Sequence, residues 1–133
     1  MIFIDSNIPM YLVGSPHPHK IEAEHAVETL ISRREKLVVD AEVLQEILYR
    51  YAAIDRRDAI QPAFDAVLGL VDEIFPIELD DVQRAKTIVL GRHSISARDA
   101  IHLAIMQRHR IERILSFDRG FDEFPAVQRI TGA

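Results

Sequence analysis

Cysteine is absent from this sequence of 133 residues. Without it the chain can form neither a disulfide framework nor a thiolate metal site, and the composition fits a reducing cytosol. Long apolar runs are also missing. The apolar stretch at the N-terminus is interrupted by Asp5, so we predict neither a signal peptide nor a membrane span. We therefore expect a cytoplasmic protein with no membrane partner.

Several catalytic motifs are missing as well. The sequence has no glycine-rich phosphate loop, no Gly-x-Ser-x-Gly motif and no pair of histidines spaced four apart as in zinc enzymes. Two histidines, His17 and His19, lie beside prolines in the segment 15–19, which we predict to be a loop. We interpret them as surface histidines and not as metal ligands, so any metal site must be sought among the carboxylates.

The formal net charge of −5 argues at first sight against a nucleic-acid partner. The interpretation changes if five of the acidic residues bind cations in one site, because the remainder of the chain then carries no net charge. These five candidates are Asp5, Glu46, Asp99, Asp118 and Asp122. The charge of the chain therefore does not exclude a nucleic-acid substrate.

Short apolar runs alternate with stretches of helical periodicity along the chain. They predict strands at 2–4, 37–39, 73–77, 114–118 and 127–130, and helices at 6–13, 20–34, 41–54, 56–72, 79–91 and 96–106. Strands that alternate with helices form parallel βαβ units. We therefore predict one α/β domain over residues 1–133, a three-layer α/β/α sandwich with a central parallel sheet. Pro76 indicates that its strand lies at an edge of this sheet.

Three aspartates are expected at one edge of the sheet. Asp5 and Asp118 each follow an apolar strand, and Asp99 lies in the first turn of a helix that begins at the same edge. If the two strands are neighbours, Asp5 and Asp118 lie roughly 5 Å apart. Carboxylates this close repel one another unless a proton or a cation lies between them. The arrangement therefore indicates a metal site.

Each aspartate also has a structural interpretation, and the fourth acid is ambiguous. Asp99 forms part of a possible capping box with Ser96, and Asp118 suits a helix cap. Glu42 and Glu46 share one face of a helix, and periodicity alone slightly favours Glu42. Taken together, several carboxylates suit a hard cation such as Mg²⁺ or Mn²⁺. The chemistry typical of such a site is metal-assisted phosphodiester hydrolysis.

Four segments resemble, in order and spacing, the signature of PIN-domain ribonucleases. They are Ile4–Asn7, Gln45–Tyr49, Ala97–Ala104 and Ser116–Asp122. In size and layout the whole chain is similar to the VapC toxins of VapBC toxin–antitoxin pairs. The resemblance implies a doubly wound parallel sheet and an Mg²⁺- or Mn²⁺-dependent endoribonuclease that leaves a 5′-phosphate and a 3′-hydroxyl.

The resemblance also assigns roles to residues and implies partners. The catalytic acids would be Asp5, Glu46, Asp99 and Asp118, and the three aspartates among them would be metal ligands. This selects Glu46 over Glu42. Ser6, Asn7 and Asp122 would support the site. The implied partners are an RNA substrate, a VapB-like antitoxin protein and a second copy of the chain in a homodimer.

There are four alternatives. A DNA flap nuclease is the nearest enzymatic variant, but such enzymes usually carry helical insertions for which 133 residues leave no room. A phosphatase of the haloacid dehalogenase type also begins with a strand that ends in aspartate, but it needs a second acid where this chain has Asn7, and no partner lysine is evident. A PIN nuclease of RNA processing that is not a toxin would share all four acids. A PIN-like binding module would have no activity, and a metal-dependent cleavage assay separates it from an enzyme.

Overall fold

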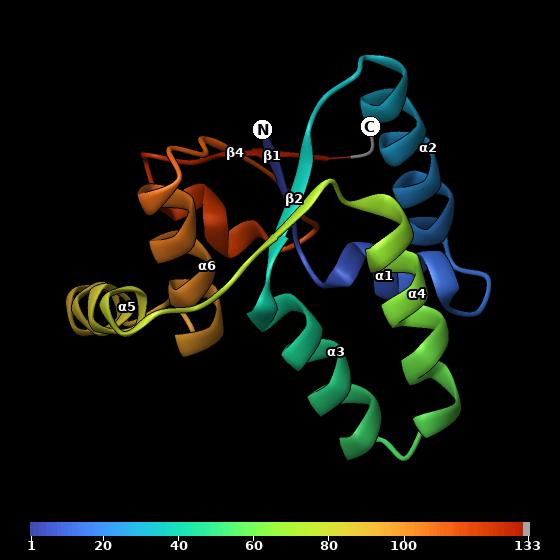
Figure 1. Cartoon of the computed structure of the whole chain (residues 1–133), viewed down its shortest axis with the longest axis horizontal. Helices are drawn as coiled ribbons and strands as arrows, with labels where there is room; N and C mark the ends of the chain where they lie inside the picture. The colour runs from blue at the N-terminus through green and yellow to red at the C-terminus, as the bar shows by residue number, and fades with distance from the viewer. Residues whose placement is uncertain (132–133) are drawn as a thin grey trace.

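The computed structural model describes residues 1–131, and its centre is a five-stranded parallel sheet of order β3-β2-β1-β4-β5 (Figure 1). The strands are β1 (Ile2–Ile4), β2 (Leu37–Asp40), β3 (Glu73–Phe75), β4 (Arg113–Leu115) and β5 (Gln128–Ile130). Every neighbouring pair is parallel. Residues of β1 and β2 are buried throughout, as expected for strands covered on both faces. Pro76 follows β3, which is an edge strand as predicted.

Helices cover both faces of the sheet and complete the predicted α/β sandwich. They are α1 (Asn7–Val13), α2 (Pro18–Ser32), α3 (Ala41–Ala53), α4 (Ile60–Leu70), α5 (Leu79–Gly91) and α6 (Ala97–Arg108). Helix α1 packs against α2 and α4, whereas α5 packs against α6 on the other side of the strands (Figure 1). Two 3₁₀-helices, η1 (Arg57–Ala59) and η2 (Arg119–Glu123), complete the fold. No helix within residues 1–131 has both the length and the apolar character needed to cross a membrane.

The strand order places a switch in chain direction beside β1. The chain proceeds outward from β1 through β2 to β3, and then crosses the sheet to β4 and β5 on the other side of β1. In open parallel sheets, ligands bind at such a switch, outside the carboxyl ends of the strands. In this protein the switch lies between the ends of β1 and β4.

Several boundaries differ from the sequence prediction. Helix α2 begins at Pro18 because the His17 side chain caps it, accepting a hydrogen bond from the backbone N–H of His19 at 3.0 Å. The helix expected at 56–72 is divided into η1 and α4. Strand β4 ends at Leu115 and not at Asp118. The last of these differences changes which side chain lies beside Asp5.

Candidate functional site

Asp5 lies directly after β1, and only 3% of its surface is exposed. One carboxylate oxygen accepts a hydrogen bond from the backbone N–H of Ser6 at 2.8 Å. The other accepts from the Ser116 hydroxyl at 2.6 Å and from the Asn7 amide at 3.3 Å. Burial nevertheless raises the pKa of Asp5, although nearby His102 and the Ser116 bond act in the opposite direction. The surrounding chain therefore fixes the orientation of this carboxylate. Its hydrogen bonds do not fully offset the free-energy cost of burying its negative charge.

Ser116, and not Asp118, occupies the position beside Asp5. Ile4 pairs with Leu115 across the two strands, so the next residue of each strand, Asp5 and Ser116, also face one another. The Ser116 hydroxyl accepts a hydrogen bond from the backbone N–H of Asp118 at 2.9 Å. The expectation that Asp118 lies directly opposite Asp5 was wrong by two residues, because this turn ends the strand early.

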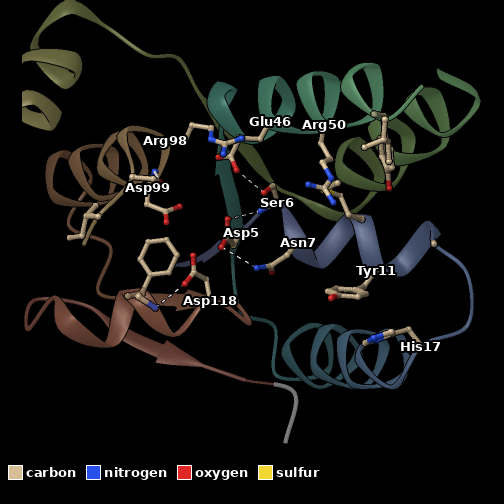
Figure 2. Close-up of a pocket in the computed structure, with 18 of the residues that line it drawn as sticks. Asp5, Ser6, Asn7, Tyr11, His17, Glu46, Arg50, Arg98, Asp99 and Asp118 are labelled. Carbon is tan, nitrogen blue, oxygen red and sulfur yellow. Dashed lines mark hydrogen bonds between the residues drawn. The ribbon is translucent and has the colours of Figure 1, made fainter. Parts of the chain in front are cut away.

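Asp118 still reaches the site from the start of η2. Its carboxylate accepts the backbone N–H of Gly120 at 2.8 Å, and the residue is exposed. Asp118 lines the same cleft as Asp5. In Figure 2 it extends from the far side of the cleft toward Asp5. The structure therefore brings the two aspartates to one cleft, but Asp118 reaches it from the start of η2, whereas the strand pattern predicted the end of a strand.

Asp99 lies in the first turn of α6, as predicted. The Ser96 hydroxyl caps this helix by accepting the Asp99 backbone N–H at 3.1 Å. The reciprocal bond of a capping box is not formed, and within residues 1–131 the Asp99 carboxylate accepts no hydrogen bond. Burial, reinforced by the Asp5 carboxylate, raises the pKa of Asp99 to about 7. This carboxyl is half-buried at the cleft beside other acids. A cation bound there would offset both the cost of burying its charge and the repulsion from Asp5.

Glu46 is the fourth acid of the cleft. One of its carboxylate oxygens accepts the Ser6 hydroxyl at 2.9 Å, and the other contacts the imidazole of His102. Glu46 is the only glutamate among the described residues that line the cleft. Glu42 lies one helical turn closer to the start of α3 and does not line the cleft. The geometry thus favours the choice that the family resemblance made over the choice that periodicity favoured.

His102 and Asp40 belong to this site and were missed in the sequence. The His102 side chain is completely buried, with Nδ1 2.8 Å from Asp40 and Nε2 against Glu46 and 3.9 Å from Asp5. Burial lowers the pKa of His102, but the carboxylates of Asp40 and Glu46 outweigh it and raise the pKa well above the ordinary value. A signal was available, because Asp40 ends an apolar strand as Asp5 does. His102 also lies three residues after Asp99, on the same helical face.

Asp122 lies apart from the four acids. Its carboxylate accepts two hydrogen bonds from the Arg129 guanidinium, at 2.9 and 3.0 Å, and these bonds lower the pKa of Asp122. It is not among the described residues that line the cleft. The structure therefore pairs Asp122 with Arg129 and not with the acids of the cleft.

The acids line a cleft of about 770 Å³ at the switch point of the sheet. Figure 2 shows Glu46, Arg50 and Arg98 along one side and Tyr11 and His17 along the other. Both arginines are exposed. The cleft is thus acidic at the carboxyl edge of the sheet and has positive charge on one of its walls.

The donor set fits a divalent cation. Ligand atoms of Asp5, Glu46 and His102 lie within 4.8 Å of one another. His102 with a raised pKa is an imidazolium at neutral pH and donates hydrogen bonds, so the carboxylate oxygens are the better ligands. The Asn7 side-chain oxygen is also buried here, without a hydrogen-bond partner within residues 1–131. Several oxygen donors and an excess of negative charge suit a hard cation.

Comparison with known proteins identifies a family for this chain. Residues 2–127 match the PIN domain family. Ribonuclease VapC13 of Mycobacterium tuberculosis is 58% identical over 130 residues, which cover 98% of this chain and 99% of that protein.

Two solved structures share the fold over nearly the whole chain. The first is VapC20 of Mycobacterium tuberculosis, described as a sarcin–ricin loop cleaving toxin, with a TM-score of 0.74, 19% identity and coverage of 98% of this chain and 99% of that one. The second is VapBC2 from Rickettsia felis bound to a DNA fragment from its promoter, with a TM-score of 0.74, 16% identity and 98% coverage of each chain. These structures confirm the predicted fold.

Proposed function

This chain belongs to the PIN-domain family and, within it, to the VapC ribonucleases, and on this premise we propose that it is a metal-dependent endoribonuclease, the toxin of a toxin–antitoxin pair. The observation that carries the proposal is the convergence of Asp5, Glu46, Asp99 and Asp118 on one cleft. Within residues 1–131 Asp99 has no ion-pair partner, and the charge of His102 does not offset the effects of burial and of Asp5 on its pKa. A cluster of acids that is costly to keep charged is suited to cation binding.

The cation we propose is Mg²⁺ or Mn²⁺, held by Asp5, Asp99 and Asp118. When bound, it would supply Lewis-acid activation of water and neutralise charge on the scissile phosphate. Asp5 is already oriented for this role by Ser6, Asn7 and Ser116. The oxygen ligands favour these hard cations over zinc.

We assign Glu46 to the proton transfers of the hydrolysis. Its two oxygens are held by different partners, Ser6 on one side and His102 on the other. A carboxylate fixed in this way can accept a proton from attacking water without first reorienting. Ser6 and Asn7 are positioning residues in this scheme. Asp122 would act on the site only from a distance, through the segment that also carries Asp118.

The proposed partners are RNA as the substrate and a VapB-like antitoxin as the inhibitor. A solved structure from Klebsiella pneumoniae that shares this fold is described as a toxin–antitoxin complex, and the 58% identity to a VapC ribonuclease supports a corresponding partner here. A basic side chain of the antitoxin placed among the four carboxylates would neutralise them as a cation does. We also propose a homodimer and a cytoplasmic location, where RNA is available.

The test is cleavage of RNA by the purified chain in Mg²⁺, in Mn²⁺ and in EDTA. We expect cleavage with either cation, no cleavage in EDTA, and no cleavage by the Asp99→Asn variant. Cleavage that persists in EDTA would refute the metal dependence. An inactive but correctly folded wild type would favour the binding-module alternative.

A further inference from the structure

Four aromatic rings pack against one another beside the acidic cleft. We call Tyr11, His17, His19 and Phe117 the aromatic wall. The Tyr11 ring lies 5.2 Å from that of His17 and 5.4 Å from that of Phe117, which it meets edge to face. His19 stacks on Phe117 at 4.2 Å. Tyr11 and His17 line the same cleft as the four acids, so these two rings of the wall are part of that surface (Figure 2).

Helix α1 joins the aromatic wall directly to the acids. Asn7, which donates to Asp5, and Tyr11 are four residues apart and therefore lie on one face of α1. The helical rise separates them by about 6 Å along the axis. This separation is of the order of one nucleotide in an extended strand. A strand whose phosphate lies at the acids would therefore place a neighbouring base near Tyr11.

The wall is held by rigid elements. His17 is fixed as the cap of α2, and Phe117 directly precedes the site residue Asp118. The Tyr11 hydroxyl makes no hydrogen bond within residues 1–131, and its ring is positioned by packing against the hydrophobic core and the neighbouring rings. Fixed aromatic rings of this kind provide stacking surfaces for bases.

The opposite side of the cleft has the complementary chemistry. Arg50 and Arg98 are exposed there and line the cleft with Glu46 (Figure 2). Guanidinium groups bind phosphate oxygens, and base stacking on aromatic rings is the usual mode by which proteins hold single-stranded RNA. Stacking rings on one side and phosphate-binding groups on the other match the two parts of an unpaired nucleotide.

We propose that Tyr11 and His17 form a stacking subsite for the base next to the scissile phosphate, which must be unpaired to enter the subsite. This inference rests on the proposed ribonuclease function. Paired bases are already stacked within their own duplex, so they cannot enter between the wall and the arginines without unpairing.

The direct test is a stacking signal. Short single-stranded RNAs of random sequence, each with 2-aminopurine at one position, are added to the Asp99→Asn variant, which removes one negative charge and is expected not to cleave. We expect fluorescence quenching on binding at one position and no comparable quenching with a duplex of the same sequence. Adding Tyr11→Leu to this variant should abolish the quenching and weaken binding by roughly five- to a hundredfold.

Kinetics with matched variants provide a second readout. Tyr11→Leu should raise KM by a similar factor, roughly five- to a hundredfold, with little change in kcat, and Tyr11→Phe should remain close to wild type because the ring is retained. His17→Asn keeps a helix-capping acceptor but removes the ring, and should raise KM less than Tyr11→Leu. His25→Asn, at an exposed histidine of α2 outside the cleft, is the control. Melting temperatures establish that each variant is folded.

The outcomes separate this inference from the proposed function. If wild type cleaves RNA but Tyr11→Leu binds, quenches and cleaves as wild type does, the stacking subsite is refuted. Equal quenching by duplex RNA would also refute it, as would a Tyr11→Leu defect confined to binding of the antitoxin protein. If wild type cleaves no RNA, the ribonuclease function fails, and the quenching measurement still decides whether the wall stacks a base.

Discussion

The raised pKa of Asp99 predicts that rising pH lowers the stability of the metal-free protein and increases the stabilisation that a bound metal adds. Without metal, the folded protein retains a proton at Asp99 up to a pKa of about 7, whereas the ordinary value is 3.8. The folded state therefore binds more protons than the unfolded state between these values, and its stability falls as pH rises through this range. A cation must displace the same proton, so stabilisation by Mg²⁺ grows as pH rises.

The size of the effect follows from mass action. At an Mg²⁺ concentration a hundredfold above the Kd of the ionised site, binding stabilises the fold by about 2.7 kcal/mol at pH 8. At pH 6, one unit below the pKa of Asp99, roughly nine in ten of these carboxyls are protonated and the apparent affinity is about tenfold weaker. The stabilisation then falls to about 1.4 kcal/mol. For a chain of this length, the stabilisations at pH 8 and pH 6 correspond to increases in melting temperature of roughly 8 °C and 4 °C.

Thermal unfolding at pH 6 and pH 8, each with EDTA and with Mg²⁺, measures both trends. Asp99→Asn should lose most of the Mg²⁺ response and the part of the pH dependence that belongs to this carboxyl. Glu112→Gln, which removes an exposed charge outside the cleft, should behave as wild type. An Mg²⁺ shift of equal size at both pH values would refute the reasoning, as would a metal-free protein that gains stability from pH 5 to pH 7.

Three further predictions concern single side chains. Glu46→Gln should lower the cleavage rate about a hundredfold or more while Glu42→Gln stays near wild type, as measured by steady-state kinetics, and the reverse result would mean that the helix face is misassigned. His102→Leu leaves two carboxylates without their buried partner and should destabilise the fold by about 3–5 kcal/mol in urea unfolding. Arg108→Met leaves the buried Asp81 without its two 2.8 Å hydrogen bonds and should cost about 2 kcal/mol, with cleavage per folded molecule unchanged.

The order of strands and helices could be predicted because it depends on local patterns. Fully apolar runs such as 2–4 and 37–39 can be buried only in the middle of a covered sheet, and they are β1 and β2. The end of β4 could not be predicted in the same way. There the Ser116 hydroxyl accepts the backbone N–H of Asp118, and this local bond turns the chain away from the strand.

Part of the candidate site was predictable for a similar reason. Asp5 and Asp99 could be placed at one edge because parallel βαβ geometry brings strand ends and helix starts together. The contact between His102 and Asp40 joins residues 62 positions apart, one inside a helix and the other at the end of an apolar strand. No local pattern specifies such a contact. Glu46 was selected by family resemblance, because Glu42 has the same periodicity and only the neighbouring elements distinguish the two.

The contacts of His102 explain how a site built from mutually repelling acids can be held in place. Asp40 caps α3 by accepting the Val43 backbone N–H at 3.0 Å, and its other oxygen contacts His102 of α6. His102 contacts Glu46 in turn, so one buried imidazolium links the start of α3, its second turn and α6. Its positive charge offsets the fully buried carboxylate of Asp40 and the partly buried carboxylate of Glu46. The acids that remain uncompensated, Asp99 above all, are those that face the cleft, where a cation can complete the balance of charge.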